Sequence, residues 1–249
     1  MLDDTILKVK RKLDSSVWWN SKLAKRVIPR SEFAKNVAVL SGGTAVAQVV
    51  GIITTPIFTR LYSPQHFGIL ALFASVSGVI RVIASGRYEL AVLLPRKDKE
   101  AINLVFLGSL ISCLVGSLSL LVVLFFSDSI ATLLGENRVS GLLILLPLDI
   151  LVFGIYNSLS YWCNRKKFYK IMSLETLSRA ITQAGLRLGL FFIVPDERGL
   201  VYSFVGGHII SFLFLVLRSL RSFKFCLVDF DVIKAVGQKY IKFPVFSTP

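Results

Sequence analysis

The chain has 249 residues, of which 54% are hydrophobic, and its mean hydropathy is +0.68. A soluble domain of this length needs more polar surface than this composition supplies, so we predict an integral membrane protein. The formal net charge is +14, but the basic residues lie in the gaps between apolar stretches rather than on one compact face, so we expect no nucleic-acid partner.

Residues 1–35 precede the first apolar stretch and hold nine basic and four acidic side chains. Their apolar residues recur at helical spacing: Leu2, Ile6, Val9, Leu13 and Val17. This pattern predicts either an amphipathic helix lying in the membrane interface or a solvated basic tail. We expect the segment to be cytoplasmic in both cases.

Six apolar stretches follow, and most approach or exceed the roughly 20 residues that a helix needs to cross hydrocarbon. They are residues 37–58, 67–86, 101–126, 141–162, 171–194 and 200–217. Small residues recur at helix-packing spacing, as in Gly108, Ser112 and Gly116. We therefore predict an all-α membrane protein in which six transmembrane helices form one bundle over residues 36–217.

The basic residues also predict the orientation of the bundle. Residues 1–35, 87–100, 163–170 and 218–249 together hold 23 Lys and Arg, whereas the alternate loops hold one each. By the positive-inside rule, both termini are expected on the cytoplasmic side, and residues 218–249 form a cytoplasmic segment.

Motifs for enzymatic chemistry are missing from the sequence. There is no phosphate-binding loop, dinucleotide fingerprint, zinc-protease motif or nucleophile elbow, and the predicted loops are too short for a soluble catalytic domain. The three cysteines, Cys113, Cys163 and Cys226, lack metal-ligand spacing. We expect no catalytic residue, no metal site and no cofactor.

The fifth apolar stretch carries a polar stripe. Glu175, Arg179, Gln183 and Arg187 follow one another at i, i+4 spacing, which places them on one face of a helix. A charge in hydrocarbon costs at least about 2.5 kcal/mol on insertion scales, so such residues usually face a protein interior or a watery cavity. Glu175 and Arg179 either neutralise each other or contribute to that cavity.

Four more polar residues lie within the apolar stretches: Gln48, Arg81, Asp149 and His208. Arg81 is about 8 Å from the end of its stretch at 1.5 Å per residue, so it can line a cavity or extend to the headgroups. Asp149 lies at a depth between Arg179 and Arg187 and can pair with either. If Asp149 pairs elsewhere, Arg187 is available to an anionic ligand, and a guanidinium suits phosphate. His208 is either a packing residue or a proton relay.

Four short motifs resemble those of bacterial polysaccharide flippases. They read FTRLYSPQHFG at residues 58–68, GRYELAVLLP at 86–95, YWCNRKKF at 161–168 and KYIKFP at 239–244. The resemblance is to the polysaccharide-transport branch of the multidrug/oligosaccharidyl-lipid/polysaccharide exporter superfamily, and it extends over most of the chain after residue 36.

This resemblance implies a transporter of 12–14 helices in two six-helix bundles, located in the bacterial cytoplasmic (inner) membrane. The cargo would be an undecaprenyl-diphosphate-linked oligosaccharide, such as an O-antigen (lipopolysaccharide) or exopolysaccharide repeat unit, moved by alternating access. This chain corresponds to the first bundle, so we expect a homologous second six-helix half as a partner, besides the lipid bilayer and polysaccharide polymerase machinery.

On this interpretation the polar stripe faces the groove that the second half would close. The candidates for a cationic cavity are Arg187, Arg179 and Arg81. The candidates for polar partners, or for coupling to a proton or sodium gradient, are Asp149, Glu175, Gln183, Gln48 and His208.

Three alternatives remain open. The chain can belong to an exporter of another amphiphile in the same superfamily, or it can be a non-transporting membrane partner. A polysaccharide polymerase or ligase is less favoured, because such an enzyme needs a long outer loop with catalytic residues.

Overall fold

The computed structural model describes residues 30–219, 223 and 227–247. The chain divides into two compact units, residues 1–39 and 40–249. In the first unit only residues 30–39 are described, and they are helical. The interfacial helix predicted for residues 1–35 therefore lies almost entirely outside the described residues.

Most of the described residues are helical and none is in a strand, which confirms the predicted all-α class. The elements are α2 (Arg30–Leu61), α3 (Pro64–Arg81), α4 (Tyr88–Ala91), α5 (Asp98–Leu133), the 3₁₀ helix η1 (Asn137–Leu145), α6 (Leu146–Arg165), α7 (Tyr169–Phe191), α8 (Glu197–Ser219), α9 (Phe230–Lys239) and α10 (Lys242–Ser247). Each of the six predicted apolar stretches overlaps one of the longer helices.

Four helical stretches in the described part are long and apolar enough to cross a membrane: Ala34–Leu61, Asp98–Leu133, Asn137–Arg165 and Glu197–Ser219. The helices α3 and α7 are not among them. The first has only 18 residues and includes Gln65, His66 and Arg81, and the second carries Glu175 and two arginines. The chain is thus a multi-pass membrane protein with four apolar candidate spans, and its two other long helices, α3 and α7, are more polar.

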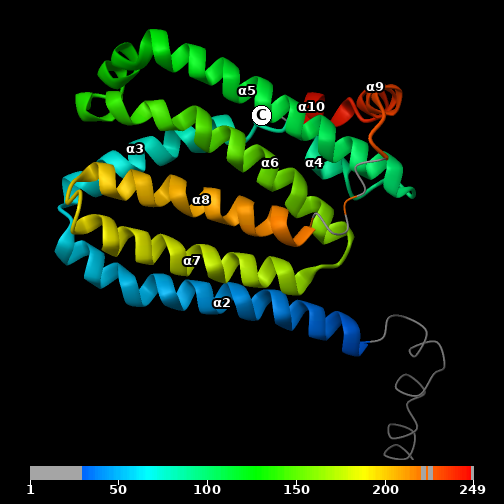
Figure 1. The fold of residues 1–249 in the computed structure, drawn as a ribbon, viewed down its shortest axis with the longest axis horizontal. Coiled ribbons are helices and arrows are strands. Elements are labelled where there is room, and N and C mark those ends of the chain that lie inside the picture. Colours follow the sequence, from blue (N-terminus) through cyan, green and yellow to red (C-terminus); the bar gives the residue numbers. More distant parts are fainter. Residues whose placement is uncertain (1–29, 220–222, 224–226, 248–249) are drawn as a thin grey trace, which may run out of the picture. The chain divides into compact units, whose positions relative to one another are not determined.

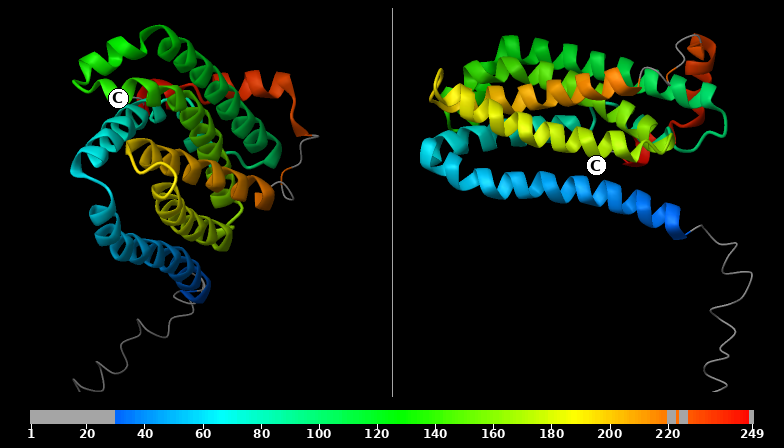
Figure 2. Two further views of the ribbon diagram at one scale, coloured as in Figure 1. Left: turned by 60° about the vertical axis from the view of Figure 1, so that its left-hand side comes forward. Right: turned by 60° about the horizontal axis from the view of Figure 1, so that its bottom comes forward.

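Helices α5, α6, α7 and α8 lie side by side (Figures 1 and 2). The closest neighbours are the antiparallel pairs α5–α6 and α7–α8, and α6 also contacts α8. Helix α3 packs against α6 and α8. We call the end formed by residues 82–97, 166–168 and 227–247 the basic end.

Local sequence explains where α3 begins and ends. Ser63 caps its N-terminus by accepting a hydrogen bond from the backbone N–H of His66, and Pro64 occupies the first turn, where its missing N–H costs nothing. The predicted stretch continues to Gly86, but the helix stops at Arg81. Beyond it the chain folds as successive turns whose backbone N–H groups bond to residues three positions earlier, and Gly86 and Arg87 then adopt left-handed backbone angles with φ of 61° and 59°.

Small residues allow α5 and α6 to approach closely, as the sequence predicts. A Cβ atom added to Gly154 on α6 would overlap the Ser112 side chain on α5 and lie 3.3 Å from Cβ of Ala84. The Ser112 hydroxyl donates to the carbonyl of Gly108, so its position is fixed. The close approach of α5 and α6 therefore requires a glycine at position 154.

At the basic end, α9 is held against α5 by polar contacts. The buried Asn103 amide donates to the carbonyl of Leu227 (2.9 Å) and accepts from the N–H of Asp229 (2.9 Å). Lys99 Nζ lies 2.9 Å from the Asp229 carboxylate, and Lys239 Nζ lies 2.7 Å from Glu100. Buried Ile233 and Val236 complete the contact.

The crossing at Gly154 predicts an asymmetry between two glycine substitutions. Gly154→Ala should lower the free energy of unfolding by about 1–3 kcal/mol, because the added methyl overpacks the α5–α6 contact. The control is Gly185→Ala on α7, where an added Cβ meets no atom within 4 Å; it should be neutral or stabilise by up to about 1 kcal/mol. Thermal unfolding in detergent measures both, and equal midpoints would contradict the assignment.

The docking of α9 should depend on pH. The hydrogen bond from Lys99 lowers the pKa of Asp229 below its usual value, so the docked state gains stability above the ordinary aspartate pKa and loses it as pH falls through the lowered one. The distribution of distances between spin labels at Gln238→Cys on α9 and Leu110→Cys on α5 should broaden in acid. Asp229→Asn should broaden it already at neutral pH; an unchanged distribution in both cases would exclude this ion pair as a docking contact.

Candidate functional site

A buried ion pair joins α3 to α6 in the middle of the bundle. Arg81 Nη2 donates to Asp149 Oδ2 at 2.5 Å, and the two side chains are 12% and 0% exposed. The hydroxyl of buried Ser77, one turn before Arg81, donates to the same carboxylate oxygen. The second carboxylate oxygen, Oδ1, lies 3.1 Å from Nδ1 of His208 on α8. Three helices therefore converge on one carboxylate.

His208 Nδ1 faces a donor and an acceptor at once. It lies 3.0 Å from Arg81 Nη2 as well as 3.1 Å from Asp149 Oδ1. A protonated Nδ1 donates to Asp149, whereas an unprotonated Nδ1 accepts from Arg81. The tautomer of His208 thus determines which of these contacts is a hydrogen bond.

Aromatic rings enclose this cluster. The Arg81 guanidinium carbon lies 4.5 Å from the ring centre of Phe153 and 5.2 Å from that of Phe204. Phe204 also packs edge-on against His208 at 4.7 Å. Because these rings exclude water, the ion pair is a low-dielectric contact in which each charge depends on the other.

The cluster decides between the alternatives left open for Arg81 and Asp149. Arg81 turns inward to Asp149, so it neither extends to the headgroups nor presents a free guanidinium. Asp149 pairs with Arg81, and not with Arg179 or Arg187 as their depths suggested. The reason is that Ser77 and Arg81, four residues apart, share the face of α3 that contacts Asp149 on α6.

Glu175 and Arg179 form the intrahelical pair that their spacing indicates. Arg179 Nε lies 3.7 Å from Glu175 Oε1. The Glu175 side chain is 4% exposed, and its other oxygen accepts a hydrogen bond from the Tyr156 hydroxyl of α6 at 3.0 Å. The Arg179 side chain remains 32% exposed. Glu175 is therefore committed to α6 and α7, while part of Arg179 stays accessible.

Arg187 has no carboxylate within ion-pair distance among the described residues. Its Nε donates to the hydroxyl of Ser203 on α8 at 3.4 Å. Its guanidinium carbon lies 5.8 Å from the ring centre of Phe58, near the end of α2. The positive charge is thus partly enclosed by neutral groups, which is the environment of a side chain that can accept an anion.

The remaining members of the polar set are separated from one another. Gln183 packs against Gly207 of α8, where an added Cβ would overlap its side chain. Gln48 is exposed on α2. The predicted stripe therefore divides: Glu175 faces α6, and Gln183 and Arg187 face α8.

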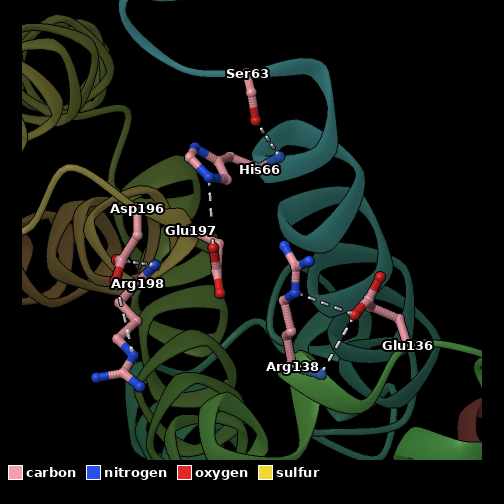
Figure 3. Close-up of polar contacts among 7 residues, drawn as sticks. All are labelled: Ser63, His66, Glu136, Arg138, Asp196, Glu197 and Arg198. Carbon is pink, nitrogen blue, oxygen red and sulfur yellow. Dashed lines mark hydrogen bonds and ion pairs between the residues drawn. The ribbon is translucent and has the colours of Figure 1, made fainter.

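At the end opposite the basic end, polar side chains lie within ion-pair distance of one another (Figure 3). Arg138 Nε lies 3.7 Å from Glu136, Arg198 Nε lies 4.0 Å from Asp196, and His66 Nε2 lies 3.6 Å from Glu197. Arg138 and Arg198 are the second residues of η1 and α8, at the starts of these elements, and both side chains are more than half exposed. They contrast with Arg187, which lies within a helix and lacks such a partner.

Sequence reasoning missed the neutral residues that complete these contacts. Ser77 and Ser203 appear as ordinary small packing residues in apolar stretches, and Tyr156, on the same helix as Asp149, belongs to no motif. One pattern was available: Ser77 precedes Arg81 by four residues, so the two share a helix face. For Ser203 the only signal is its place in a small-residue stripe with Gly199 and Gly207.

Comparison with known proteins places this arrangement in a family. A family model described as "Polysaccharide biosynthesis protein" matches residues 57–237, which is more than half of the chain. The chain belongs to this family. The matched range contains the first three motifs of the predicted resemblance, and the fourth, at residues 239–244, lies just beyond it.

One curated relative is the succinoglycan biosynthesis transport protein ExoT of Rhizobium meliloti (strain 1021). It is 31% identical to the chain over 103 residues, which represent 39% of this chain and 20% of the relative. The aligned part therefore spans about a fifth of that protein's length. No solved structure matches the chain. The family description connects this chain to polysaccharide biosynthesis.

The ion pair at the centre of this family member should behave as a coupled unit. Arg81→Met or Asp149→Leu alone leaves an unpaired buried charge and should lower the free energy of unfolding by about 3–5 kcal/mol. The double variant removes both charges and should be more stable than either single variant. Thermal unfolding in detergent tests this, and strictly additive losses would show that the two side chains act independently.

Proposed function

We propose that this chain is the first six-helix bundle of a flippase for undecaprenyl-diphosphate-linked oligosaccharide. The basic end faces the cytoplasm, and a homologous second half completes a transporter that works by alternating access in the bacterial cytoplasmic membrane. The diphosphate is the group that the bundle recognises, and the polyprenyl tail stays in lipid.

The observation that carries this proposal is the unpaired charge of Arg187. The six predicted apolar stretches hold three arginines, Arg81, Arg179 and Arg187, but only two carboxylates, Asp149 and Glu175. Both carboxylates are used by the first two arginines. One net positive charge therefore remains at Arg187, and an anion that enters the bundle would gain most by contacting it.

Arg179 is proposed as a second, weaker contact along the path. It lies two helical turns closer to the basic end than Arg187 on the same helix, and its guanidinium is only partly neutralised by Glu175 at 3.7 Å. Arg81 is removed from the proposed cationic set, since its charge is matched by Asp149. The two remaining arginines would offer successive positions to a diphosphate.

This proposal predicts that Arg187→Ala slows the reorientation of a lipid-linked oligosaccharide. Loss of one charge-assisted contact should reduce the rate by about tenfold or more, because such contacts contribute about 1.5–3 kcal/mol. The assay follows undecaprenyl-diphosphate-linked oligosaccharide in vesicles that contain the 249-residue chain together with its second half.

Arg198→Ala is the matched control, because that exposed arginine, at the start of α8, pairs with Asp196 just before the helix (Figure 3). It should leave the rate unchanged. Arg187→Lys keeps the charge but not the two parallel donors, so it should restore the rate only in part. Equal rates for the wild type and Arg187→Ala would exclude Arg187 from the path, and the absence of reorientation by the wild type would contradict the flippase proposal itself.

A further inference from the structure

The Arg187 guanidinium is fixed on one edge by a buried serine. Ser203 is 0% exposed, and its hydroxyl donates to the carbonyl of Leu200 at 2.7 Å. With its proton committed in this way, the hydroxyl oxygen can only accept, and it faces Nε of Arg187 at 3.4 Å. Ser203 is therefore oriented to hold the Nε side of the guanidinium.

A tyrosine from outside the predicted spans fixes the backbone of the same residue. The Tyr62 hydroxyl donates to the carbonyl of Arg187 at 2.9 Å, and the tyrosine is 2% exposed. Burial raises the pKa of Tyr62 above its usual value, so the hydroxyl stays protonated and remains a donor. A Cβ atom on Gly199 would lie 3.2 Å from this hydroxyl, so glycine leaves room for it on α8.

The other edge of the guanidinium is open. The ring centre of Phe58, which is 4% exposed, lies 5.8 Å from the guanidinium carbon. Among the described residues, neither Nη1 nor Nη2 of Arg187 has a hydrogen bond or an ion pair. The two Nη donors form the pair that binds two oxygens of one phosphate in parallel.

We propose that Ser203 and Tyr62 are positioning residues, which aim the Nη1–Nη2 edge of Arg187 at a lipid-linked diphosphate. This inference rests on the proposed function and adds the residues that orient its main contact. Ser203 sets the rotation of the guanidinium, and Tyr62 fixes the segment of α7 that carries it. Neither side chain touches the ligand, so both act through Arg187.

The same helix provides a matched control for Ser203. Ser211, two turns further along α8, is 1% exposed, and its hydroxyl has no hydrogen-bond partner among the described residues. Ser203→Ala and Ser211→Ala therefore remove the same atom from similarly buried positions. Only the first removes a contact with Arg187.

The test measures binding by the 249-residue chain in phosphatidylcholine nanodiscs, with undecaprenyl diphosphate as the probe. Ser203→Ala should raise the apparent dissociation constant about fivefold to tenfold, as expected for loss of one ordinary intramolecular hydrogen bond. Tyr62→Phe should change it in the same direction, and Ser211→Ala should not. In an Arg187→Ala background, Ser203→Ala should have no further effect, because its contribution passes through the arginine.

The outcomes separate this inference from the function on which it rests. If the wild type does not bind the probe, or Arg187→Ala binds it equally well, the proposed function is wrong. Two results would show that only the positioning role is wrong, provided that Arg187→Ala weakens binding. In the first, Ser203→Ala and Ser211→Ala bind the probe with the same affinity. In the second, Ser203→Ala weakens binding in the Arg187→Ala background as much as it does in the wild type. If phosphatidic acid binds with the same affinity as undecaprenyl diphosphate and is weakened by the same substitutions, the assignment to a diphosphate is wrong.

Discussion

The arrangement of charge in this bundle depends on the ion pair between Arg81 and Asp149. An isolated carboxylate in a region enclosed by Phe153 and Phe204 would be strongly unfavourable, so Asp149 requires a cation, and the bundle provides one from α3. Ser77 and His208 satisfy the remaining capacity of the carboxylate. The same contact joins three helices and determines which arginine keeps a free charge.

That constraint leads directly to the candidate site. With Asp149 committed to α3 and Glu175 shared between Tyr156 and Arg179, α7 retains a guanidinium without a carboxylate partner at Arg187. Ser203 and Phe58 surround this charge with neutral groups rather than neutralising it. A polar stripe that seemed uniform in the sequence thus contains a structural part near the basic end and an anion-binding candidate further along.

Much of this could be predicted from the sequence, because apolar length and i, i+4 spacing are local properties. The helical class, the positions of the long helices, the pair Glu175–Arg179 and the family resemblance all follow from such patterns. The partner of Asp149 could not be predicted, because depth along a helix does not specify the direction in which a side chain points. The end of α3 was misplaced because residues 82–84 are apolar like the helix before them, although the chain continues there as turns and then takes left-handed backbone angles at Gly86 and Arg87.

The central claim is that Asp149 pairs with Arg81, so that Arg187 is the arginine that contacts a diphosphate. Its most direct measurement is a solid-state NMR distance between ¹³C-labelled arginine Cζ atoms and the phosphorus atoms of bound undecaprenyl diphosphate. The account predicts a close carbon–phosphorus contact that disappears in Arg187→Lys and persists in the Arg81→Met/Asp149→Leu double variant. A contact that survives Arg187→Lys and disappears in the double variant would contradict it.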